Sequence, residues 1–585
     1  MPPPSWDHET DVVVVGSGAG GMAAALTARH GGLDVLVVEK AATIGGSTAL
    51  SGGTVWVPLS DGWQASGVPD SRDAVWTYLH HVVGAAGPEE QRRVFLDAGP
   101  LALRFLQRHA GVRFAVRAVS PDYHPDRPGA APGGRSLNPA EFDGRRLGRR
   151  RFRELRGPLP EFTVLGGMMV DMTDVGHLLA VTRSFASLRY GLRLVARHAV
   201  DRARSYGRGT RLVLGNALAG QLFLALVEAG VPYWLRTPVT GLLRDGGRVS
   251  GVQVVRGGRT LAVRARRGVV LATGGFPWDE AMRARHLPAP TGPYSMAPEE
   301  NSGDGIALAR EAGAVLGEGH ASPAFWSPVS VLEQPDGSVV RYCHLAWDRA
   351  KPGLLAVDAR GRRFVNEAAS YHEFVRGMHR AHAEAPAIPA VLVCDSDFVE
   401  RWGLGLALPG GRPRRHLEKA GYLVKAATLN ELARRTGVDP AGLADTVERF
   451  NTYAERGVDP EFGKGGNSYN VHLGDPGHRP NPCLGPVRKP PFYAVKVFPG
   501  DIGTALGIRA DGHARALDGN GRAIPGLYVA GNDMHSVMGG EYPAPGITLG
   551  PALTFGWLAG LHLSRPAGET HATEASEDVR MSTVP

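Results

Sequence analysis

The chain has 585 residues, and its 65 Lys and Arg against 57 Asp and Glu give a net charge of +8. This length predicts two or more structural units. The 43% hydrophobic and 21% charged content is that of an ordinary globular protein. No Lys/Arg block with interleaved aromatic residues occurs, so the positive charge does not predict nucleic-acid binding.

The cysteines and the N-terminus predict a cytoplasmic protein without a metal centre. Cys343, Cys394 and Cys483 lie far apart and no CxxC pair occurs. Neither a disulfide framework nor structural zinc is expected, which fits a reducing compartment. MPPPSWDHET lacks the basic and apolar regions of a secretory signal, and no apolar run approaches the roughly 20 residues of a spanning helix.

Residues 11–39 predict a strand, a helix and a second strand. DVVVV and LDVLVVE are apolar runs rich in β-branched residues, as buried parallel strands are, and MAAALTARH between them is a good helix former. GSGAGG contains GxGxxG, the pattern for a tight turn, close pyrophosphate approach and close helix packing. Glu39 ends the second strand, where an acid accepts ribose hydroxyls. We predict dinucleotide contacts at Gly16, Ser17, Gly18, Ala19, Gly20, Gly21, Glu39 and Lys40.

Residues 177–205, HLLAVTRSFASLRYGLRLVARHAVDRARS, predict an amphipathic helix. Apolar residues recur at 178, 181, 185, 188, 192, 195 and 199, and Arg189, Arg193 and Arg197 form another stripe. One interpretation is peripheral contact with an anionic membrane, which would suit a quinone as electron acceptor. The other is a surface helix whose apolar face packs on its own domain. We favour the packed helix, because most amphipathic helices pack in that way.

Three other segments indicate FAD rather than NAD. AATIGGSTALSGGTVWVP (41–58) adds a second glycine-rich run directly after Glu39, and RGVVLATGGF (267–276) and GLYVAGN (526–532) are apolar strands ending in glycine. A nicotinamide domain would not return to its cofactor so late, whereas a flavin laid across the sheet can be reached there. The contacts predicted from these segments are Gly46, Ser47, Thr48, Ser51, Gly52, Gly53, Ala272, Thr273, Gly274, Gly531 and Asn532.

Motifs along almost the whole chain resemble the flavoprotein family of fumarate reductases, succinate dehydrogenases and 3-ketosteroid dehydrogenases, especially its Δ1-dehydrogenase branch. They are GSGAGG, IGGSTALSGG, LATGGF, NSGDGIALA, RRFVNEAASY, NPCLGPVRKPPFYAVKVFPGDIGT, GLYVAGN and EYPAPGITLGPALTFG. The resemblance implies an α/β fold: a Rossmann-like FAD-binding domain of residues 1–325 and 495–585, with a polar tail from about 565, and an inserted α+β substrate-capping domain of residues 326–494. It also implies cofactor contacts at Val239, Asp304, Glu541, Thr548 and Leu549.

The activity implied by the resemblance is insertion of a 1,2 double bond into the A-ring of 3-ketosteroids. In EYPAPG, the O–H of Tyr542 and the N–H of Gly546 can donate to one carbonyl oxygen, and the prolines hold φ near −65°. The resemblance makes Tyr371 of NEAASY the base that removes a proton from carbon 2. It makes Tyr123 of SPDYHPDRPG the supporting phenol. Hydride then leaves carbon 1 for FAD.

The flavin is expected to be non-covalent, because Ser47 and Thr48 occupy the segment where covalent members carry a histidine. An external acceptor, with a quinone as one candidate, would reoxidise it. Three alternatives remain open: a fumarate reductase-like enzyme, a 3-ketosteroid 4(5α)-dehydrogenase and a catalytically inert FAD-binding protein. The phenol and glycine at 542–546 argue against the first, and an inert protein has no reason to keep three such tyrosines.

Overall fold

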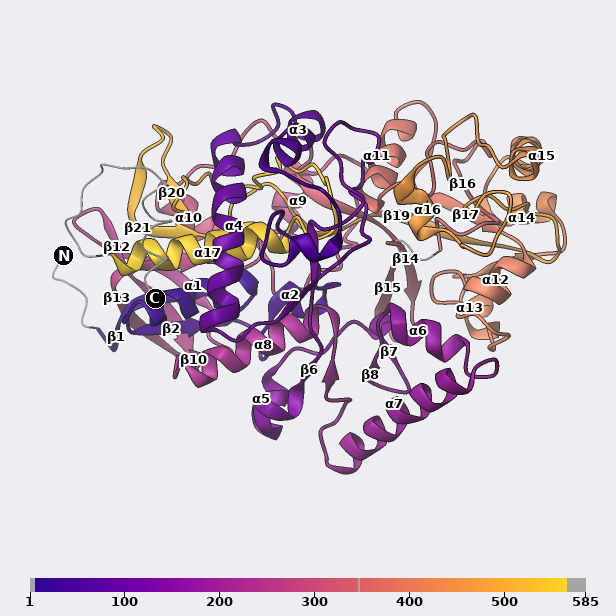
Figure 1. The fold of residues 1–585 in the computed structure, drawn as a ribbon. Helices are drawn as coiled ribbons and strands as arrows, with labels where there is room; N and C mark the ends of the chain where they lie inside the picture. Colours follow the sequence, from indigo (N-terminus) through magenta and orange to yellow (C-terminus); the bar gives the residue numbers. More distant parts are fainter. Residues whose placement is uncertain (1–5, 346–347, 566–585) are drawn as a thin grey trace.

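The computed structural model describes residues 6–345 and 348–565 (Figure 1). The tail predicted from about residue 565 therefore lies almost wholly outside the described residues. Within them, no helix is both long enough and apolar enough to span a membrane.

A sheet of eight described strands carries the predicted dinucleotide motif. The order is β10-β2-β1-β13-β12-β11, with β21 beside β13 and β20 beside β21. The central pairs β10–β2, β2–β1, β1–β13 and β13–β21 are parallel, and β11, β12 and β20 are antiparallel. The bounds are β1 (His8–Val15), β2 (Val35–Val38), β10 (Tyr233–Trp234), β11 (Val239–Asp245), β12 (Arg248–Arg256), β13 (Arg259–Leu271), β20 (Arg515–Leu517) and β21 (Ala523–Val529).

Helices from both ends of the chain pack on this sheet. The predicted motif helix is α1 (Ala19–His30), and α17 (Leu549–Ser564) lies along it in Figure 1. A Cβ on Gly556 would come within 2.2 Å of the Gly20 carbonyl oxygen, and one on Gly560 within 2.6 Å of that of Ala24. Glycine therefore permits a backbone approach that no larger residue allows. Nearby helices are α2 (Gly46–Leu50), α3 (Arg72–Val82), α4 (Glu89–His109), α8 (Leu214–Glu228), α9 (Glu280–His286) and α10 (Asp304–Glu311).

A second, antiparallel sheet lies beyond the first (Figure 1). Its order is β15-β14-β19-β17-β16, with β18 also on β19. The strands are β14 (Ala324–Glu333), β15 (Val339–Cys343), β16 (Leu354–Val357), β17 (Ala390–Cys394), β18 (Val424–Ala426) and β19 (Phe492–Thr504). The helices between them are α11 (Tyr371–His382), α12 (Ser396–Trp402), α13 (Arg415–Lys419), α14 (Leu429–Thr436), α15 (Pro440–Arg456) and α16 (Ser468–Leu473). The predicted domain limits, 326 and 495, fall inside β14 and β19, so this sheet extends past both of them.

Short elements are inserted into the first sheet between β2 and β10. They form a three-stranded sheet, β3-β5-β4, and two small ribbons, β6–β9 and β7–β8. Their bounds are β3 (Val55–Trp56), β4 (Phe114–Val116), β5 (Ser136–Pro139), β6 (Phe142–Asp143), α5 (Gly148–Glu154), β7 (Thr163–Val164), β8 (Met168–Met169) and β9 (Arg211–Leu212).

The amphipathic segment at 177–205 is not one helix, so that prediction is wrong. It contains the end of α6 (Met172–Leu179) and the whole of α7 (Phe185–Ala203). The turn between them ends at Ser184, whose hydroxyl caps α7 by accepting from the N–H of Ser187 at 3.3 Å. The favoured packing is also wrong, because the predicted apolar stripe of α7 faces outward: Phe185 is 81% exposed and Leu192 61%.

Candidate active site

Three tyrosines from distant parts of the chain meet in one buried cluster. The O–H of Tyr123 donates to the hydroxyl oxygen of Tyr371 across 3.1 Å. The ring of Tyr542 stacks on that of Tyr123 with 5.6 Å between centroids, and meets the ring of Tyr371 edge-on at 5.2 Å. Their exposed fractions are 9%, 8% and 3% for Tyr123, Tyr371 and Tyr542. The structure therefore brings together the three phenols that the sequence assigned to one reaction.

Three of the four backbone carbonyls of the 543–546 loop accept hydrogen bonds from other segments of the chain. Prolines offer no N–H, so the loop is held through its oxygens. The donors are the Tyr123 N–H (2.8 Å) and the Tyr78 O–H (2.6 Å) to Pro543, the Ser136 O–H to Pro545 (3.1 Å), and the Trp56 N–H to Gly546 (3.1 Å). Because one of these donors is the backbone of Tyr123, the predicted supporting phenol and the predicted carbonyl-binding loop are held together as a unit.

Gly546 must be glycine for two reasons. Its φ is +101°, and a Cβ there would lie 2.5 Å from the Trp56 nitrogen and 2.6 Å from the Thr54 oxygen. Among the hydrogen bonds of the described residues, none uses the Gly546 N–H as a donor. That amide is therefore free to donate to a ligand.

Tyr371 is the first residue of α11. The preceding Ser370 caps the helix by accepting from the Glu373 N–H at 3.2 Å. A side chain at this position lies at the positive end of the helix, where a developing negative charge is favoured.

Burial keeps all three phenols protonated in the ligand-free protein. It raises the pKa of Tyr123 and of Tyr371 well above the usual value near 10, and that of Tyr542 to about 12. Tyr542 thus remains a hydrogen-bond donor throughout the neutral range, as a carbonyl-binding group must. Tyr371 can act as a base only if a bound substrate makes the transfer of its proton favourable.

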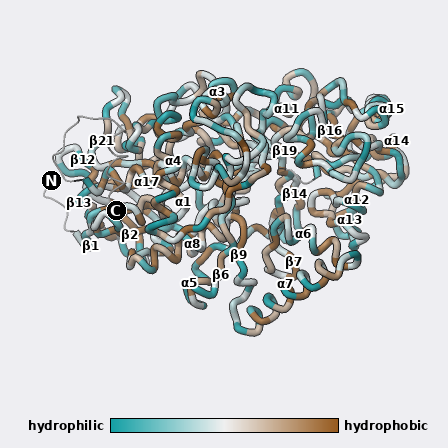
Figure 2. Tube along the Cα trace, viewed as in Figure 1, coloured by the Kyte–Doolittle hydropathy of each residue, from teal (hydrophilic) through white to brown (hydrophobic). Residues whose placement is uncertain are grey.

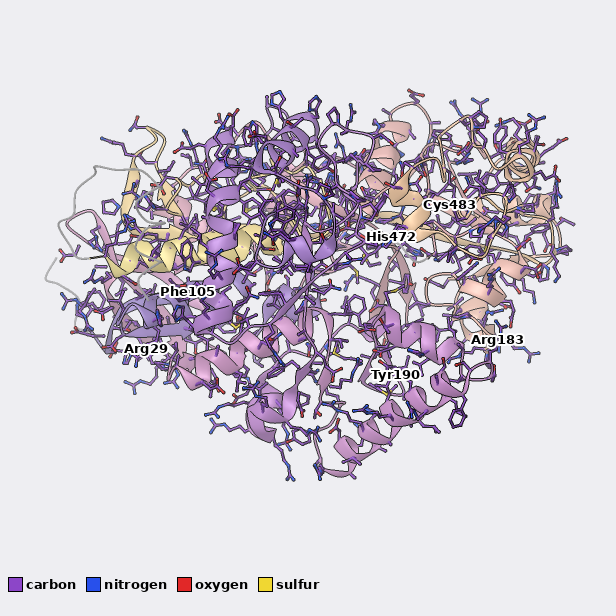
Figure 3. All side chains as sticks on the ribbon, in the orientation of Figure 1. Arg29, Phe105, Arg183, Tyr190, His472 and Cys483 are labelled. Atoms are coloured by element: carbon purple, nitrogen blue, oxygen red, sulfur yellow. The ribbon has the colours of Figure 1, made fainter. Side chains whose placement is uncertain are left out.

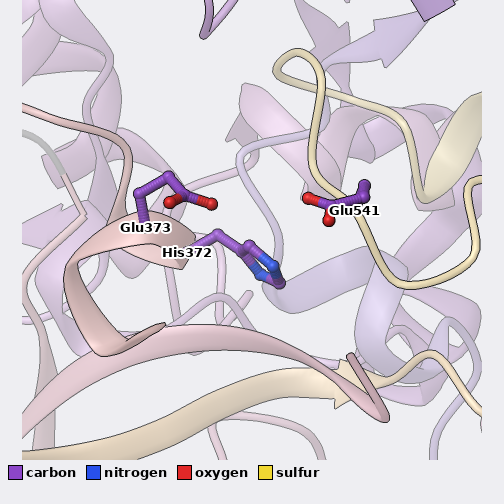
Figure 4. A group of neighbouring side chains, drawn as sticks. All are labelled: His372, Glu373 and Glu541. Carbon is purple, nitrogen blue, oxygen red and sulfur yellow. The ribbon is translucent and has the colours of Figure 1, made fainter. Parts of the chain in front are cut away.

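Beside the cluster, an arginine joins α11 to the 539–546 loop. The guanidinium of Arg376 pairs with the Glu373 carboxylate at 2.9 Å and with that of Glu541 at 2.7 Å. Figure 4 shows these two carboxylates on either side of His372. Burial lowers the pKa of His372 well below its usual value, so the ring is neutral, and its Nδ1 accepts the Trp326 N–H at 3.2 Å. The two carboxylates are therefore paired with Arg376, and the neutral His372 ring is held by the Trp326 N–H.

A cavity of about 360 Å³ lies against the Tyr123 end of the cluster. Its volume is in the range of small-molecule pockets. Most of its lining residues carry polar groups, and they come from the 123–127 loop, the segment 366–373 around the start of α11, and the start of α16: Tyr123, His124, Pro125, Asp126, Arg127, Asn366, Ala369, Ser370, Glu373, Asn467 and Asn470.

The glycine motif forms a cradle of the kind that a dinucleotide requires. A Cβ on Gly16 would lie 2.2 Å from the Ala272 oxygen, and one on Gly21 would lie 2.2 Å from the Gly16 oxygen. A Cβ on Gly18, in contrast, would meet only the Thr48 hydroxyl oxygen, at an ordinary contact distance of 3.8 Å. Gly16 and Gly21 therefore pack backbones together, while Gly18 leaves room for phosphate at the N-terminus of α1.

The predicted ribose-binding acid is positioned from two sides. Oε2 of Glu39 accepts from the N–H and O–H of Ser17 at 3.0 and 2.6 Å, and Oε1 accepts from the Ala41 N–H at 2.9 Å. The Thr48 hydroxyl accepts from the Ala19 N–H at 2.9 Å. These bonds fix the motif, α2 and the end of β2 in one arrangement.

Most of the other predicted cofactor residues follow strands of the parallel sheet or begin helices beside it. Carboxyl ends of parallel strands share one edge, so residues after β1, β2, β13 and β21 meet there. Three residues follow β13 (Ala272, Thr273 and Gly274), and two form a short turn after β21 (Gly531 and Asn532). Around α2, three residues begin the helix (Gly46, Ser47 and Thr48) and three follow it (Ser51, Gly52 and Gly53). Asp304 begins α10 and is paired with Lys40 at 2.8 Å, Val239 begins β11, and Thr548 stands at the N-cap position of α17, which Leu549 begins. Glu541 instead has its carboxylate on Arg376.

Sequence reasoning missed two buried polar residues at this edge. Asp533 accepts from the Thr273 N–H at 2.6 Å and the Gly275 N–H at 2.8 Å, joining the ends of β13 and β21. The side-chain amide of Asn301 donates to the Ser47 hydroxyl at 3.0 Å. Asp533 directly follows GLYVAGN, which contains an apolar strand, and Asn301 begins NSGDG just before α10. Those positions were the signals that could have identified them.

Tyr469 and Tyr78 were also missed at the phenol cluster. The ring of Tyr469 lies 4.8 Å from that of Tyr123. Nothing in the surrounding GGNSYN distinguishes it from a surface tyrosine, and its place depends on how the second sheet closes over the first.

Comparison with known proteins identifies this arrangement. The family model described as FAD binding domain matches residues 11–549. A 3-oxosteroid 1-dehydrogenase of Mycobacterium tuberculosis is 40% identical over 96% of this chain and 99% of its own. A 4-oxocyclohex-2-ene-1-carboxylate 5-dehydrogenase of Sinomonas cyclohexanicum is also 40% identical, over 95% of this chain and 94% of its own. The solved structure of the 3-ketosteroid Δ1-dehydrogenase of Sterolibacterium denitrificans, in complex with 1,4-androstadiene-3,17-dione, is 39% identical in sequence. It superposes with a TM-score of 0.88 and covers 95% of this chain and 99% of its own.

The fold and the cradle define an FAD-dependent oxidoreductase, and FAD is its cofactor. The chain belongs to the FAD-binding domain family, among relatives that include the 3-oxosteroid 1-dehydrogenases. The recognition made from the sequence motifs is confirmed.

Proposed function

We propose that this protein introduces a 1,2 double bond into the A-ring of 3-ketosteroids. The observation that carries the proposal is the buried contact of three phenols, with Tyr123 and Tyr371 bonded at 3.1 Å and Tyr542 against both rings. Removing two hydrogens next to a steroid ketone requires a pair of donors for the carbonyl, a base and a hydride acceptor. The residues described here could supply the donors and the base, and FAD, when bound, would supply the acceptor.

The carbonyl oxygen on carbon 3 would accept from the Tyr542 O–H and the free Gly546 N–H. Donors held in place before the reaction stabilise the negative charge that develops on that oxygen, and one such donor is typically worth about 2.7–4 kcal/mol. This makes the hydrogen on carbon 2 acidic enough for a phenol oxygen to remove.

Tyr371 would take that proton, with Tyr123 donating to its oxygen. A hydrogen bond donated to a phenolate stabilises it, so the Tyr123 O–H would stabilise the Tyr371 anion that removes the proton. The polar cavity beside Tyr123 would let the proton leave toward solvent. The bound FAD supplies the acceptor for the hydride leaving carbon 1, so the substrate loses one proton and one hydride.

We also propose that the first sheet is a Rossmann-like FAD-binding domain and that the 324–504 sheet, with its helices, caps the substrate. The Arg376–Glu541 ion pair supports this division, because it joins a helix of the second sheet to the loop that begins α17. Non-covalent flavin attachment and a quinone acceptor stay predictions.

An anaerobic titration tests the function. The holoenzyme, mixed with 4-androstene-3,17-dione, should lose its flavin absorbance near 450 nm, and mass spectrometry should find a steroid lighter by two hydrogens. Succinate should leave the flavin oxidised. A flavin that stays yellow with the steroid would contradict the proposal.

A second candidate is the same chemistry on a small cyclic ketone. The Sinomonas dehydrogenase, as similar to this chain as the mycobacterial one, favours it. Steady-state kinetics with 4-oxocyclohex-2-ene-1-carboxylate and with the steroid separate the two: the substrate with the larger kcat/KM is the better assignment.

A further inference from the structure

The outer side of α6, α7 and the β7–β8 turn carries most of the large apolar side chains that are exposed among the described residues. The described residues expose thirteen such side chains, and eight of them lie between residues 165 and 200. A concentration of this kind marks an interaction site. The eight, with their exposed fractions, are Leu165 (63%), Met172 (55%), Leu179 (60%), Phe185 (81%), Leu188 (40%), Leu192 (61%), Val195 (39%) and Val200 (44%).

The inner side of α7 is small and polar, the reverse of an ordinary surface helix. Its buried residues are Ser187, Gly191, Leu194, His198 and Asp201. Asp201 accepts from the Thr210 N–H and O–H at 2.9 and 2.8 Å. These polar contacts, together with the packing of Leu194 against Met168 and Val170, fix the orientation of α7 and hold its apolar stripe away from the protein.

Arginines border the stripe. Arg189 and Arg193 follow Phe185 at intervals of four, so they form the row beside it on a helix. Arg183 and Arg204 stand at the two ends of α7. All four are exposed, and within the described ranges none has a carboxylate partner. Figure 3 shows Arg183 projecting from the α6–α7 turn, with Tyr190 between the helices.

Two of the three acidic groups of residues 165–204 are turned inward, and the third, Asp171, is 32% exposed and caps α6 by accepting from the Asp174 N–H at 2.9 Å. Asp174 is fully buried, where it accepts from the Tyr190 O–H at 2.6 Å and pairs with Arg211 at 2.7 Å. Asp201 is also fully buried. The outer face therefore combines apolar and positively charged side chains. In Figure 1, α7 runs along one edge of the molecule, and Figure 2 shows brown, hydrophobic stretches along it.

We propose that this face, made by α6, α7 and the β7–β8 turn, docks on an anionic lipid surface. A helix of this composition lies in the interface with its apolar side chains about 5–10 Å into the lipid. A second copy of the chain is a poorer occupant. A two-fold contact would place the same arginines opposite each other, and Asp171, the one partly exposed carboxylate of residues 165–204, already caps α6.

Vesicle co-sedimentation of the full-length holoenzyme tests the proposal without depending on the reaction. The protein should pellet with vesicles of phosphatidylcholine and 30% phosphatidylglycerol, and remain in the supernatant with phosphatidylcholine alone. Binding should weaken as NaCl rises from 50 to 500 mM. Arg189→Gln with Arg193→Gln should lower the partition coefficient about 30-fold. Phe185→Ser with Leu192→Ser should lower it at least as much.

Matched variants elsewhere on the surface are the controls. Val458 is also 63% exposed, and Arg259 is an exposed arginine on β13, so Val458→Ser and Arg259→Gln should bind vesicles as the wild type does. All variants change exposed side chains and should keep the wild-type unfolding temperature.

Two results would overturn the proposal. One is wild-type protein that stays in the supernatant with anionic vesicles, or patch variants that bind equally well. The other is a dimer in sedimentation velocity that Phe185→Ser converts to monomer while no vesicle binding is seen, which would assign the face to a second copy.

Discussion

A buried phenol is a poor base until its anion has a partner. The Tyr371 hydroxyl has one in Tyr123, 3.1 Å away and anchored through its own backbone to the 543–546 loop. Tyr542, with its pKa raised to about 12 by burial, stays a donor. The same burial that keeps Tyr542 protonated therefore works against Tyr371, and the hydrogen bond from Tyr123 separates their roles.

Tyr371→Phe should therefore abolish turnover while the flavin stays bound. Loss of a positioned base typically costs about 10²–10⁴-fold in rate, because no other group described in the cluster can take the proton from carbon 2. Steady-state kinetics and the flavin absorbance measure the two effects. The control is Tyr528→Phe, which removes a buried phenol bonded to His562 outside the site. A Tyr371→Phe enzyme as fast as this control would remove Tyr371 from the role of base.

Tyr123→Phe should slow the enzyme less and move its pH profile. Wild-type kcat/KM should rise with pH, since burial raises the pKa of Tyr371 and more of the phenol ionises as pH increases. Without Tyr123, a Tyr371 phenolate loses the donor that lies 3.1 Å from its oxygen, so the profile should shift to higher pH. At pH 7 the loss should be about 10–100-fold, the worth of one hydrogen bond to a charged group. An unshifted profile would mean that Tyr123 only fills space.

Which residues could be found from the sequence depended on local signals. Glu39 and the motif glycines stand at fixed spacings after an apolar strand, so their positions follow from the chain itself. The contact of Tyr123 with Tyr371 spans 248 residues and was reached only through family resemblance. Tyr469 and the orientation of α7 had no such guide. A stripe at helical spacing identifies a helix face, but which face turns inward depends on partners such as Thr210 for Asp201.

At the scale of elements, the flavin cradle depends on the close approach of α1 and α17. Gly556→Ala would place a Cβ only 2.2 Å from the Gly20 carbonyl oxygen. The helices must then move apart, which should destabilise the protein by about 1–3 kcal/mol. Because α1 begins at the phosphate-binding turn, flavin affinity should fall too. Thermal unfolding and flavin titration measure both effects.

A glycine in another helix provides the matched control. Gly176 in α6 has nothing within 4 Å of its Cβ position, so Gly176→Ala should be neutral or stabilise by about 0.5–1 kcal/mol through helix propensity. Equal effects of the two changes would show that backbone approach does not limit this interface.

At the scale of the whole molecule, the active site exists only where the two sheets meet. Tyr542 and Gly546 precede α17 of the first, whereas Tyr371 begins α11 of the second. The second sheet must therefore present residues 366–371 in a fixed place. It does so through a buried ion network four residues before Tyr371: Arg363 forms two bonds to Glu367, at 2.8 and 2.7 Å, and two to Asp459, at 3.0 and 2.8 Å.

This network should make stability depend on pH in a specified direction. Burial alone would raise the pKa of Glu367 and of Asp459, but Arg363 more than offsets it, and both lie below their usual values. Carboxylates with lowered folded pKa contribute stability that is present above about pH 4, their unfolded range, and is lost as pH falls through the folded values. Glu367→Gln leaves Arg363 and Lys464 buried with one partner fewer, which should cost about 3–5 kcal/mol at pH 7. It should also flatten the loss of stability below pH 4.

Glu431→Gln, which breaks an exposed pair with Arg435, should cost no more than about 1 kcal/mol. Urea unfolding of the two holoenzymes at pH 7 and pH 4 compares them directly. Equal costs would mean that residues 366–371 are held by packing alone, and the phenol cluster would then have to be positioned by the 543–546 loop without help from the second sheet.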